Sequence, residues 1–326
     1  DKMDCFIKER KTFKTIAVCP VLDYAMTVKS IFDEISSFLI SIDKEKIITV
    51  GDYLVTNEYI GIITGVSRGR ESAKISCEDI IKLFSRPQVY TAKGTATIEA
   101  YIESVLTSSY KENTDVIYQL PFLEIEKLTD TASAIEPDVD QGIWNLKSFL
   151  AKVRRVNNVF VDFEATKNTL KVTIQKKAVV TKNLDLSMPT IEIEEESYSN
   201  KQLGKITTIE TGGNRDWYLL TDGTITNDYQ ATDRIDGELM VINLADDADG
   251  LSEVQNIFFK NTYSHKILFS TSNARFDFYD RLKISSDGKL FSSYISAIRK
   301  KKSSLKTTYL CGEMRTQFTD KIVEEI

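Results

Sequence analysis

Short runs of β-branched and aromatic residues, separated by polar turn residues, recur along most of the 326-residue chain. Clear examples lie at residues 59–66, 159–163 and 290–298. Such runs bounded by turn signals are typical of β-strands. The pair Asp287-Gly288 lies between two of the runs and is a strong signal for a two-residue hairpin turn. The sequence therefore predicts a mainly β protein.

The length of the chain constrains how those strands are grouped. A single hydrophobic core stops growing at about 250–300 residues, so 326 residues predict two or more packed units. Apolar residues make up 42% and charged residues 28%, the composition of an ordinary globular protein rather than a disordered one.

The first third of the chain reads mostly as strands. We predict strands in residues 6–18, 47–55, 59–66 and 73–77, with a hairpin between the second and third of these. Residues 28–42 fit a helical stripe in their first half and a strand in their second, and we favour the strand there. Residues 78–84 read as a short helix with acids in its first turn. Several strands and one short helix predict a small barrel.

The middle of the chain has helical periodicity as well. Residues 97–110 predict a helix capped by Thr95 or Thr97, and residues 142–156 predict a second helix capped by Asp138 or Asp140. Residues 117–128 read as extended, and residues 159–163 and 169–174 as a hairpin. The run of glutamates at 192–196 reads as a solvated acidic linker. This block is predicted to be an α+β unit.

The last third returns to strands. We predict a hairpin from 205–210 and 216–220, a helix at 251–261, and strands at 236–243, 266–270, 279–284, 290–298 and 307–312. The predicted domains are therefore 1–94 and 203–326, which share a layout of several strands and one short helix, with an α+β domain at 95–202 between them. No sequence repeat of fixed period is visible, which leaves a structural repeat under diverged sequence open.

Charge argues against a duplex-binding protein. The formal net charge is −6, and no basic stripe is present that could replace counterions along a phosphate backbone. The basic run 299–302 lies in this acidic chain, and we interpret it as a solvated loop or a subunit contact rather than a polyanion site.

The cysteines favour free thiols over metal ligands. Cys5, Cys19, Cys77 and Cys311 form no CxxC pair, and the chain has a single histidine, His265. We predict four thiols packed as small hydrophobic groups in a reducing compartment. No apolar stretch reaches the length of a membrane helix and no signal-peptide core is visible near the start, so we predict synthesis in cytosol and no membrane span.

Individual residues that could carry chemistry all have simpler interpretations. His265 lacks partners at a catalytic spacing, residues 245–250 lack the first acid and the final glutamate of a calcium loop, and Gly212-Gly213-Asn214 matches no phosphate-binding motif. The acids Glu192, Glu194, Glu195 and Glu196 could form the carboxylate pair of a glycosidase only across a cleft. Trp144 and Trp217 are interpreted as core or interface anchors.

We therefore predict a protein that is not an enzyme, with no catalytic, cofactor-binding or metal-binding residue. Two alternatives stay open. One is a hydrolase of cell-wall glycan or peptidoglycan that uses Asp and Glu residues. The other is a receptor- or carbohydrate-binding module built on Trp217 and nearby tyrosines.

The order of predicted elements resembles the central hub, or tail-tip, proteins of tailed phages. The residues that carry the resemblance are Gly51-Asp52-Tyr53-Leu54-Val55, residues 58–66, residues 80–84, the helix from Thr97 to Asn113-Thr114-Asp115, residues 279–284 and residues 288–295. The resemblance implies two barrels related to tail-tube folds around an α+β insertion, with no catalytic residue to transfer.

The same resemblance implies a structural role in the virion. A homotrimer with two similar barrels per chain presents six similar units and can cap a sixfold tail tube. Expected partners are distal tail or tail-tube ring proteins, a tape-measure protein and a tip fibre or spike. DNA is expected to pass through without sequence-specific binding, past a net-acidic lumen.

Overall fold

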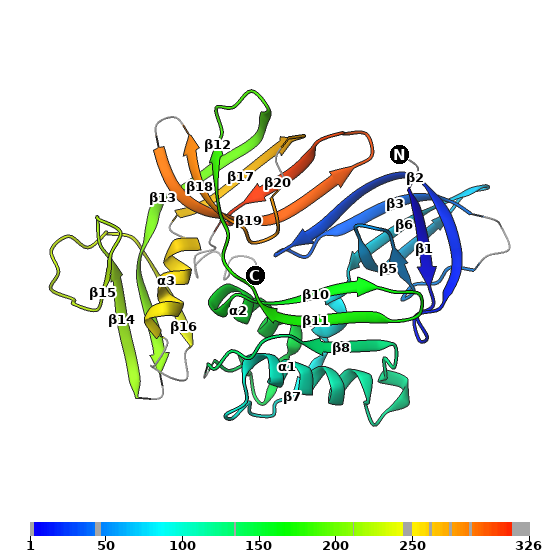
Figure 1. The fold of residues 1–326 in the computed structure, drawn as a ribbon, viewed down its shortest axis with the longest axis horizontal. Coiled ribbons are helices and arrows are strands. Elements are labelled where there is room, and N and C mark those ends of the chain that lie inside the picture. Colours follow the sequence, from blue (N-terminus) through cyan, green and yellow to red (C-terminus); the bar gives the residue numbers. More distant parts are fainter. Residues whose placement is uncertain are drawn as a thin grey trace, which may run out of the picture. The chain divides into compact units, whose positions relative to one another are not determined.

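The computed structural model describes residues 3–42, 47–133, 135–210, 212–243, 250–260, 263–273, 276–286 and 289–314. The chain divides into two compact units. The first unit comprises Asp1–Ala178 together with Arg299–Leu305, and the second comprises Val179–Ile298 together with Lys306–Ile326. Strands dominate both units, which confirms the prediction of a mainly β protein (Figure 1).

The first unit begins with a closed six-stranded barrel. Its strands are β1 (Asp4–Lys8), β2 (Thr15–Ser30), β3 (Ile35–Ser41), β4 (Tyr53–Val55), β5 (Ile60–Arg68) and β6 (Ser72–Asp79). They pair in the order β1-β4-β5-β6-β3-β2, and β2 pairs again with β1 to close the ring. Every one of these pairs is antiparallel. The small barrel predicted from the sequence is thus confirmed.

Alternation of side chains fills the barrel. On β3 the buried residues Ser36, Phe38 and Ile40 alternate with more exposed neighbours, as a strand with one face inward requires. The interior collects apolar side chains from all six strands: Cys5, Ile7, Ala17, Cys19, Val21, Met26, Phe38, Ile40, Leu54, Ile63, Ala73, Ile75 and Cys77. The ambiguous stretch 28–42 contains the end of β2 and all of β3, so its second half is a strand as predicted.

A helical block follows the barrel within the first unit. Its elements are the 3₁₀ turns η1 (Ile80–Ser85) and η3 (Val116–Tyr118), the π turn η2 (Leu106–Lys111), α1 (Ile98–Val105), α2 (Leu146–Asn157), β7 (Pro87–Val89), β8 (Leu123–Lys127), β9 (Ile143–Asn145), β10 (Val159–Ala165) and β11 (Leu170–Lys176). β10, β11 and β8 form one sheet, with β8 parallel to β11, and β7 pairs with β9. The predicted hairpin of β10 and β11 is confirmed.

The caps of the two helices test the sequence analysis directly. Thr97 caps α1, because its side chain accepts a hydrogen bond from the backbone N–H of Ala100. The predicted N-cap of α2 was wrong. Asn145, rather than Asp138 or Asp140, accepts from the backbone N–H of Ser148, because the residues before it form the strand β9.

A buried lysine connects the barrel to the helical block. Lys8 on β1 is 4% exposed, and its ammonium group donates to the carbonyl oxygens of Thr166 and Lys167 at 3.1 and 2.7 Å. Those two residues form the turn between β10 and β11. Charge-assisted hydrogen bonds to carbonyls supply the partners that a buried ammonium group requires.

The second unit is built on another set of six strands. They are β12 (Thr181–Asp185), β13 (Ile191–Glu210), β17 (Tyr263–Thr271), β18 (Arg281–Ser286), β19 (Lys289–Lys301) and β20 (Thr307–Cys311), with the last residues of β19 grouped in the first unit. Between β13 and β17 the chain adds β14 (Gly213–Leu219), β15 (Ile225–Thr226), β16 (Glu238–Asn243) and α3 (Gly250–Lys260). The predicted hairpin of β13 and β14 is confirmed. Asp287-Gly288 lies outside the described residues, although β18 and β19 pair on either side of it.

The two sets of six strands share one pairing order. In the second unit the order is β12-β18-β19-β20-β17-β13. If the six strands of each set are numbered 1 to 6 along the chain, both sets pair in the order 1-4-5-6-3-2. The sets differ in that β12 lies parallel to β18 whereas β1 lies antiparallel to β4. Among the described residues of the second set, no pairing of β12 with β13 closes the ring.

Two details of the second unit differ from the sequence analysis. The glutamates at 192–196 are not a linker, because they lie in β13 and pair with β17. On α3, Val254, Ile257 and Phe258 are buried as predicted, but Leu251 is 43% exposed. Leu251 is the second residue of α3 and lies in its first turn, ahead of the buried apolar stripe.

Candidate functional site

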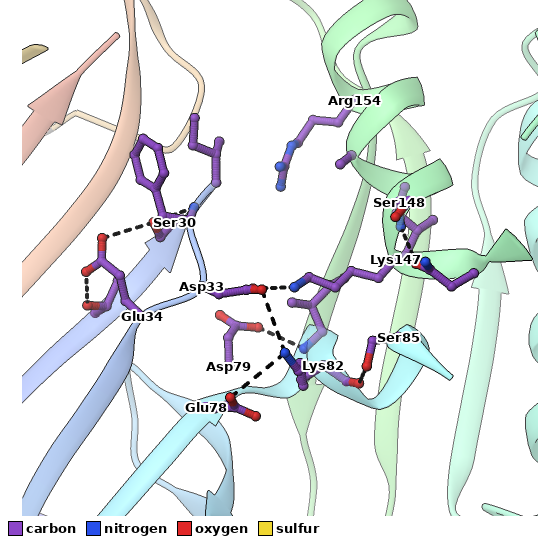
Figure 2. Close-up of a pocket in the computed structure, with 17 residues that line it drawn as sticks. Ser30, Asp33, Glu34, Glu78, Asp79, Lys82, Ser85, Lys147, Ser148 and Arg154 are labelled. Carbon is purple, nitrogen blue, oxygen red and sulfur yellow. Dashed lines mark hydrogen bonds and ion pairs between the residues drawn. The ribbon is translucent and has the colours of Figure 1, made fainter. Parts of the chain in front are cut away.

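The first unit contains a cleft lined by charged side chains (Figure 2). Its volume is about 350 Å³. The lining comes from the turn between β2 and β3, from the junction of β6 with η1, and from α2. Carboxylates and lysines that meet in a cleft are the first place to look for acid–base chemistry.

Asp33 occupies the centre of the charge network. Its carboxylate forms a hydrogen-bonded ion pair with Lys147 of α2 and lies 3.7 Å from the ammonium nitrogen of Lys82. Lys82 in turn lies 3.9 Å from a carboxylate oxygen of Glu78. The hydrogen bond from Lys147 is the main reason that the pKa of Asp33 falls below its usual value. Asp33 is therefore ionised and already neutralised by its partners.

Asp79 has the opposite electrostatic environment. Burial raises its pKa above the usual value, although a hydrogen bond to its carboxylate opposes the shift. That bond comes from the backbone N–H of Ile81 at 2.8 Å, so Asp79 is the N-cap of η1. The acids that the sequence analysis placed at the start of this short helix thus include its cap.

Two of the serine hydroxyls of the cleft are bound to groups within the chain. The hydroxyl of Ser85 donates to the carbonyl oxygen of Lys82 at 2.7 Å, and that of Ser30 donates to Glu34 at 3.4 Å. None of the lining residues is a histidine or a cysteine. The charged groups mostly bond one another across the cleft, and such an arrangement connects the barrel turn to α2 rather than activating a nucleophile.

The single histidine is a core residue of the second unit. His265 on β17 is 0% exposed, and its Nε2 lies 2.5 Å from the hydroxyl oxygen of Ser293 on β19. The ring stacks near Tyr198 of β13, with 6.4 Å between ring centroids. A nucleophile must reach a substrate, and Ser293 is also 0% exposed. His265 is thus a buried residue of the core rather than a surface residue.

Neither tryptophan presents an open face to a ligand. Trp144 is 5% exposed and stacks on Tyr101, while Trp217 is 7% exposed and donates its indole N–H to Thr208 at 3.2 Å. Sugar-binding tryptophans expose a ring face, so burial removes the anchor of the carbohydrate-binding alternative. Both residues are core anchors, as predicted.

The glutamates on β13 are held by neighbouring strands. Lys266 donates to Glu195 at 2.8 and 3.0 Å, Lys306 binds Glu192, and Glu194 accepts from Ser270. Of Gly212-Gly213-Asn214, only Gly212 lies in the turn, because Gly213, with a φ of +131°, and Asn214 already belong to β14; the predicted β-turn is thus correct for Gly212 alone. Residues 245–249 of the calcium-like loop lie outside the described residues, and Gly250 begins α3.

The described parts of the chain contain no cluster of three or more metal-ligating side chains. No helix in the same parts combines the length and the apolar character needed to cross a membrane.

The basic run 299–302 is bound to the barrel in the first unit. Arg299 donates two hydrogen bonds to Glu34, at 2.6 and 2.9 Å, and Lys300 forms an ion pair with Glu58 at 2.5 Å. Lys302 donates to the carbonyl oxygens of Val21 and Leu22 at 3.1 and 2.7 Å. These cationic groups are occupied by intrachain partners, so the run is not simply a solvated loop.

The outer wall of the barrel carries an apolar stripe. Phe6, Ile16, Val18 and Leu22 are each 40–50% exposed, and Phe6 and Val18 are cross-strand partners on β1 and β2. Outward positions on a solvated barrel strand are usually polar. Clustered exposed apolar side chains are typical of protein–protein contact surfaces. We name these four residues the outer stripe.

The fold can be compared with solved structures. It is that of phage tail proteins, over nearly the whole chain. Prophage tail protein gp18 from Listeria monocytogenes EGD-e matches with a TM-score of 0.59 at 10% identity, covering 99% of each chain. The 43 kDa tail protein of prophage MuSo2 from Shewanella oneidensis has a TM-score of 0.54 at 11% identity, covering 96% of this chain and 98% of that one.

A third structure, the tail protein from Neisseria meningitidis MC58, gives a TM-score of 0.51 at 12% identity and covers 94% of this chain and 95% of that chain. No protein-family model and no curated protein sequence matches the chain. The resemblance inferred from the sequence is therefore confirmed in the fold.

Proposed function

We propose that this protein is a structural component of the tail tip or baseplate of a tailed phage or a related injection machine. The observation that carries the proposal is the recurrence of one six-strand order in both units, within a fold shared with phage tail proteins. The protein acts in the virion after synthesis in the host cytoplasm. It acts by assembly and not by catalysis.

The proposed assembly is a homotrimeric ring that caps the tail tube. Three chains with two similar six-strand sets each offer six similar units to a sixfold tube, while the ring itself has threefold symmetry. The domain division that we propose for this role is 1–94 and 203–326 for the two tube-like domains and 95–202 for the domain between them. The proposed neighbours are distal tail or tail-tube rings, a tape-measure protein and a tip fibre or spike.

The outer stripe supports association between copies of the chain. In the closed ring each barrel strand already pairs with two others, so the side chains on the wall are the surface that another chain would bind. Phe6, Ile16, Val18 and Leu22 offer the apolar surface that the core of an oligomer interface requires. In the proposed ring, DNA passes through a net-acidic lumen that repels it, with no sequence-specific contact.

The test is the mass of the purified protein in solution, measured by light scattering across a range of concentrations. We expect a species of three times the chain mass of 37.0 kDa. Val18→Glu places a charge in the outer stripe and is expected to shift the equilibrium toward the monomer. Lys74→Glu, at an exposed position of β6, is the matched control that leaves the trimer intact. A wild-type chain that stays monomeric at high concentration contradicts the trimer.

The hydrolase alternative has its own test. The charged cleft is the place where this alternative is tested, because Asp79 there has a raised pKa and Asp33 a lowered one. Zymography on bacterial cell walls should show no clearing by the wild-type chain. Clearing that disappears in Asp79→Asn would overturn the purely structural proposal.

A further inference from the structure

Two cysteines face each other across the seam that closes the barrel. Cys5 on β1 and Cys19 on β2 are direct cross-strand partners. Their exposed fractions are 0% and 2%, and both side chains belong to the barrel core. The Cys5 thiol is close enough to Cys19 to share a side-chain hydrogen bond with it.

This placement meets the geometric demands of a disulfide. Directly opposed residues on antiparallel strands have Cα atoms about 4.5–5.5 Å apart. Disulfides join residues whose Cα atoms are about 4.4–6.8 Å apart and whose Cβ atoms point toward each other. The other cysteines lack such a partner in the described strands, because Cys77 on β6 opposes Ser36 and Ile63, and Cys311 on β20 opposes Ile267.

We propose that Cys5 and Cys19 are a redox pair that forms an intrachain disulfide and thereby makes the closure of the barrel covalent. The oxidant is a low-molecular-weight disulfide such as oxidised glutathione. The thiolate of one cysteine attacks it, forms a mixed disulfide and releases one reduced glutathione. The second cysteine then displaces the second glutathione, so two electrons and two protons leave the cysteine pair in total.

Access of the oxidant controls the rate of this reaction. The hydrogen bond with Cys19, and next to it burial, raise the pKa of the Cys5 thiol, so little thiolate forms in the closed barrel. β1 is a five-residue strand near the start of the chain, and it is the strand whose departure opens the seam. Oxidation therefore proceeds through molecules in which β1 has left the barrel, and conditions that loosen β1 accelerate it.

The stage at which the disulfide would form in the life of the particle rests on the proposed function, whereas the reaction of Cys5 with Cys19 does not. A tail component is assembled in a reducing cytosol and later enters an oxidising exterior. The bond would then lock the barrel after assembly, because residues 5–19 become a closed covalent loop in the unfolded chain as well as in the folded one.

The experiment uses the full-length chain and oxidised glutathione, in buffer and in urea below the unfolding midpoint. After alkylation of the remaining thiols, peptide mass spectrometry identifies the bonds. We expect a linked pair of peptides containing Cys5 and Cys19, formed faster in urea, and an unfolding midpoint raised by about 5 °C or more. Cys77→Ala, a matched buried control, is expected to form the same bond, and Cys19→Ala is expected to lose it.

Three outcomes overturn the proposal. They are glutathione retained on Cys5 with no bond to Cys19, a bond between Cys5 and Cys77, and a bond between Cys5 and Cys19 that lowers the unfolding midpoint. A monomeric chain that forms the bond contradicts the proposed ring and leaves the redox pair supported, so the two proposals fail separately.

Discussion

A buried carboxylate in the helical block gives the sharpest test of how the first unit is held together. Glu99 on α1 is 0% exposed. It accepts hydrogen bonds from the hydroxyl of Thr129 at 2.6 Å, and from the backbone N–H and the hydroxyl of Thr131 at 2.6 and 2.7 Å. One carboxylate therefore fastens the segment after β8 to the first turn of α1.

The perturbation is Glu99→Met, which keeps the length of the side chain and removes the acceptor. A hydrogen bond to a charged group contributes about 1.5–3 kcal/mol, and a buried donor left without a partner costs about 1–3 kcal/mol. The two threonine hydroxyls can rotate toward other acceptors, whereas the backbone N–H of Thr131 cannot. We therefore expect a loss of about 3–5 kcal/mol in the free energy of unfolding.

Glu99→Gln is the matched variant. Its amide oxygen can accept from the backbone N–H of Thr131 while its amide nitrogen donates to the threonine hydroxyls, so only the charge is lost. We expect a cost of about 1 kcal/mol. The comparison between the two variants separates the loss of the acceptor from the loss of the charge.

The charge itself predicts a dependence on pH. Burial alone would raise the pKa of Glu99, but hydrogen bonds from Thr129 and Thr131 outweigh it and hold the pKa below the ordinary 4.5. A carboxyl group whose pKa is lower in the folded state stabilises the fold above its unfolded pKa. That stability is lost as the pH falls through the folded pKa. Below about pH 4.5 the wild type should therefore lose stability more steeply than Glu99→Gln.

The assay is equilibrium unfolding in urea, followed by the fluorescence of Trp144 in a Trp217→Phe background. Trp144 stacks on Tyr101 of α1, so its emission reports on the block that contains Glu99. A Glu99→Met variant within 1 kcal/mol of its reference, or parallel pH profiles for the wild type and Glu99→Gln, would refute the reasoning.

Three further substitutions test backbone and capping features. Asn158 ends α2 with a φ of +57°, so Asn158→Gly should leave the urea midpoint nearly unchanged and Asn158→Val should lower stability by about 1 kcal/mol or more. Gly312 has a φ of +69°, and an added Cβ would lie 2.4 Å from Nε2 of His265, so Gly312→Ala should cost about 2 kcal/mol or more in thermal unfolding. Asp79→Asn keeps the hydrogen bond from Ile81 and removes a partly buried charge that desolvation disfavours, so at neutral pH its stability should match or exceed that of the wild type, whereas Asp79→Ala should lose about 1 kcal/mol.

The elements that the sequence predicted well are those whose signal is local. Thr97 as the cap of α1, the hairpin of β10 and β11 and the strand β3 each follow from residues a few positions apart. The wrong cap of α2 is also local in origin, because Asp138 and Asp140 come just before the apolar stripe that starts at Ile143, and Asp is as good a cap as Asn. The strand β9 then delays the helix until Asn145.

The features that could not be predicted from the sequence depend on contacts between residues far apart in the chain. Four glutamates within five residues have low strand propensity and read as a linker, yet Lys266, Ser270 and Lys306, all more than 70 positions away, bind Glu195, Glu194 and Glu192. The same holds for the charged cleft. Asp33 and Lys147 are more than a hundred positions apart, and no pattern around either residue indicates the other.

The recurrent strand order connects these findings to function. Pairing order is a property of contacts between distant segments, so it can persist after every local motif has diverged, and this explains why no repeat is visible in the sequence. In the barrel, the interior is filled with apolar side chains and the ring of six strands is closed. The wall of that ring exposes Phe6 and Val18, which are cross-strand partners. A charge at Val18 therefore tests association directly, because it changes the outer surface without touching the core that forms the barrel.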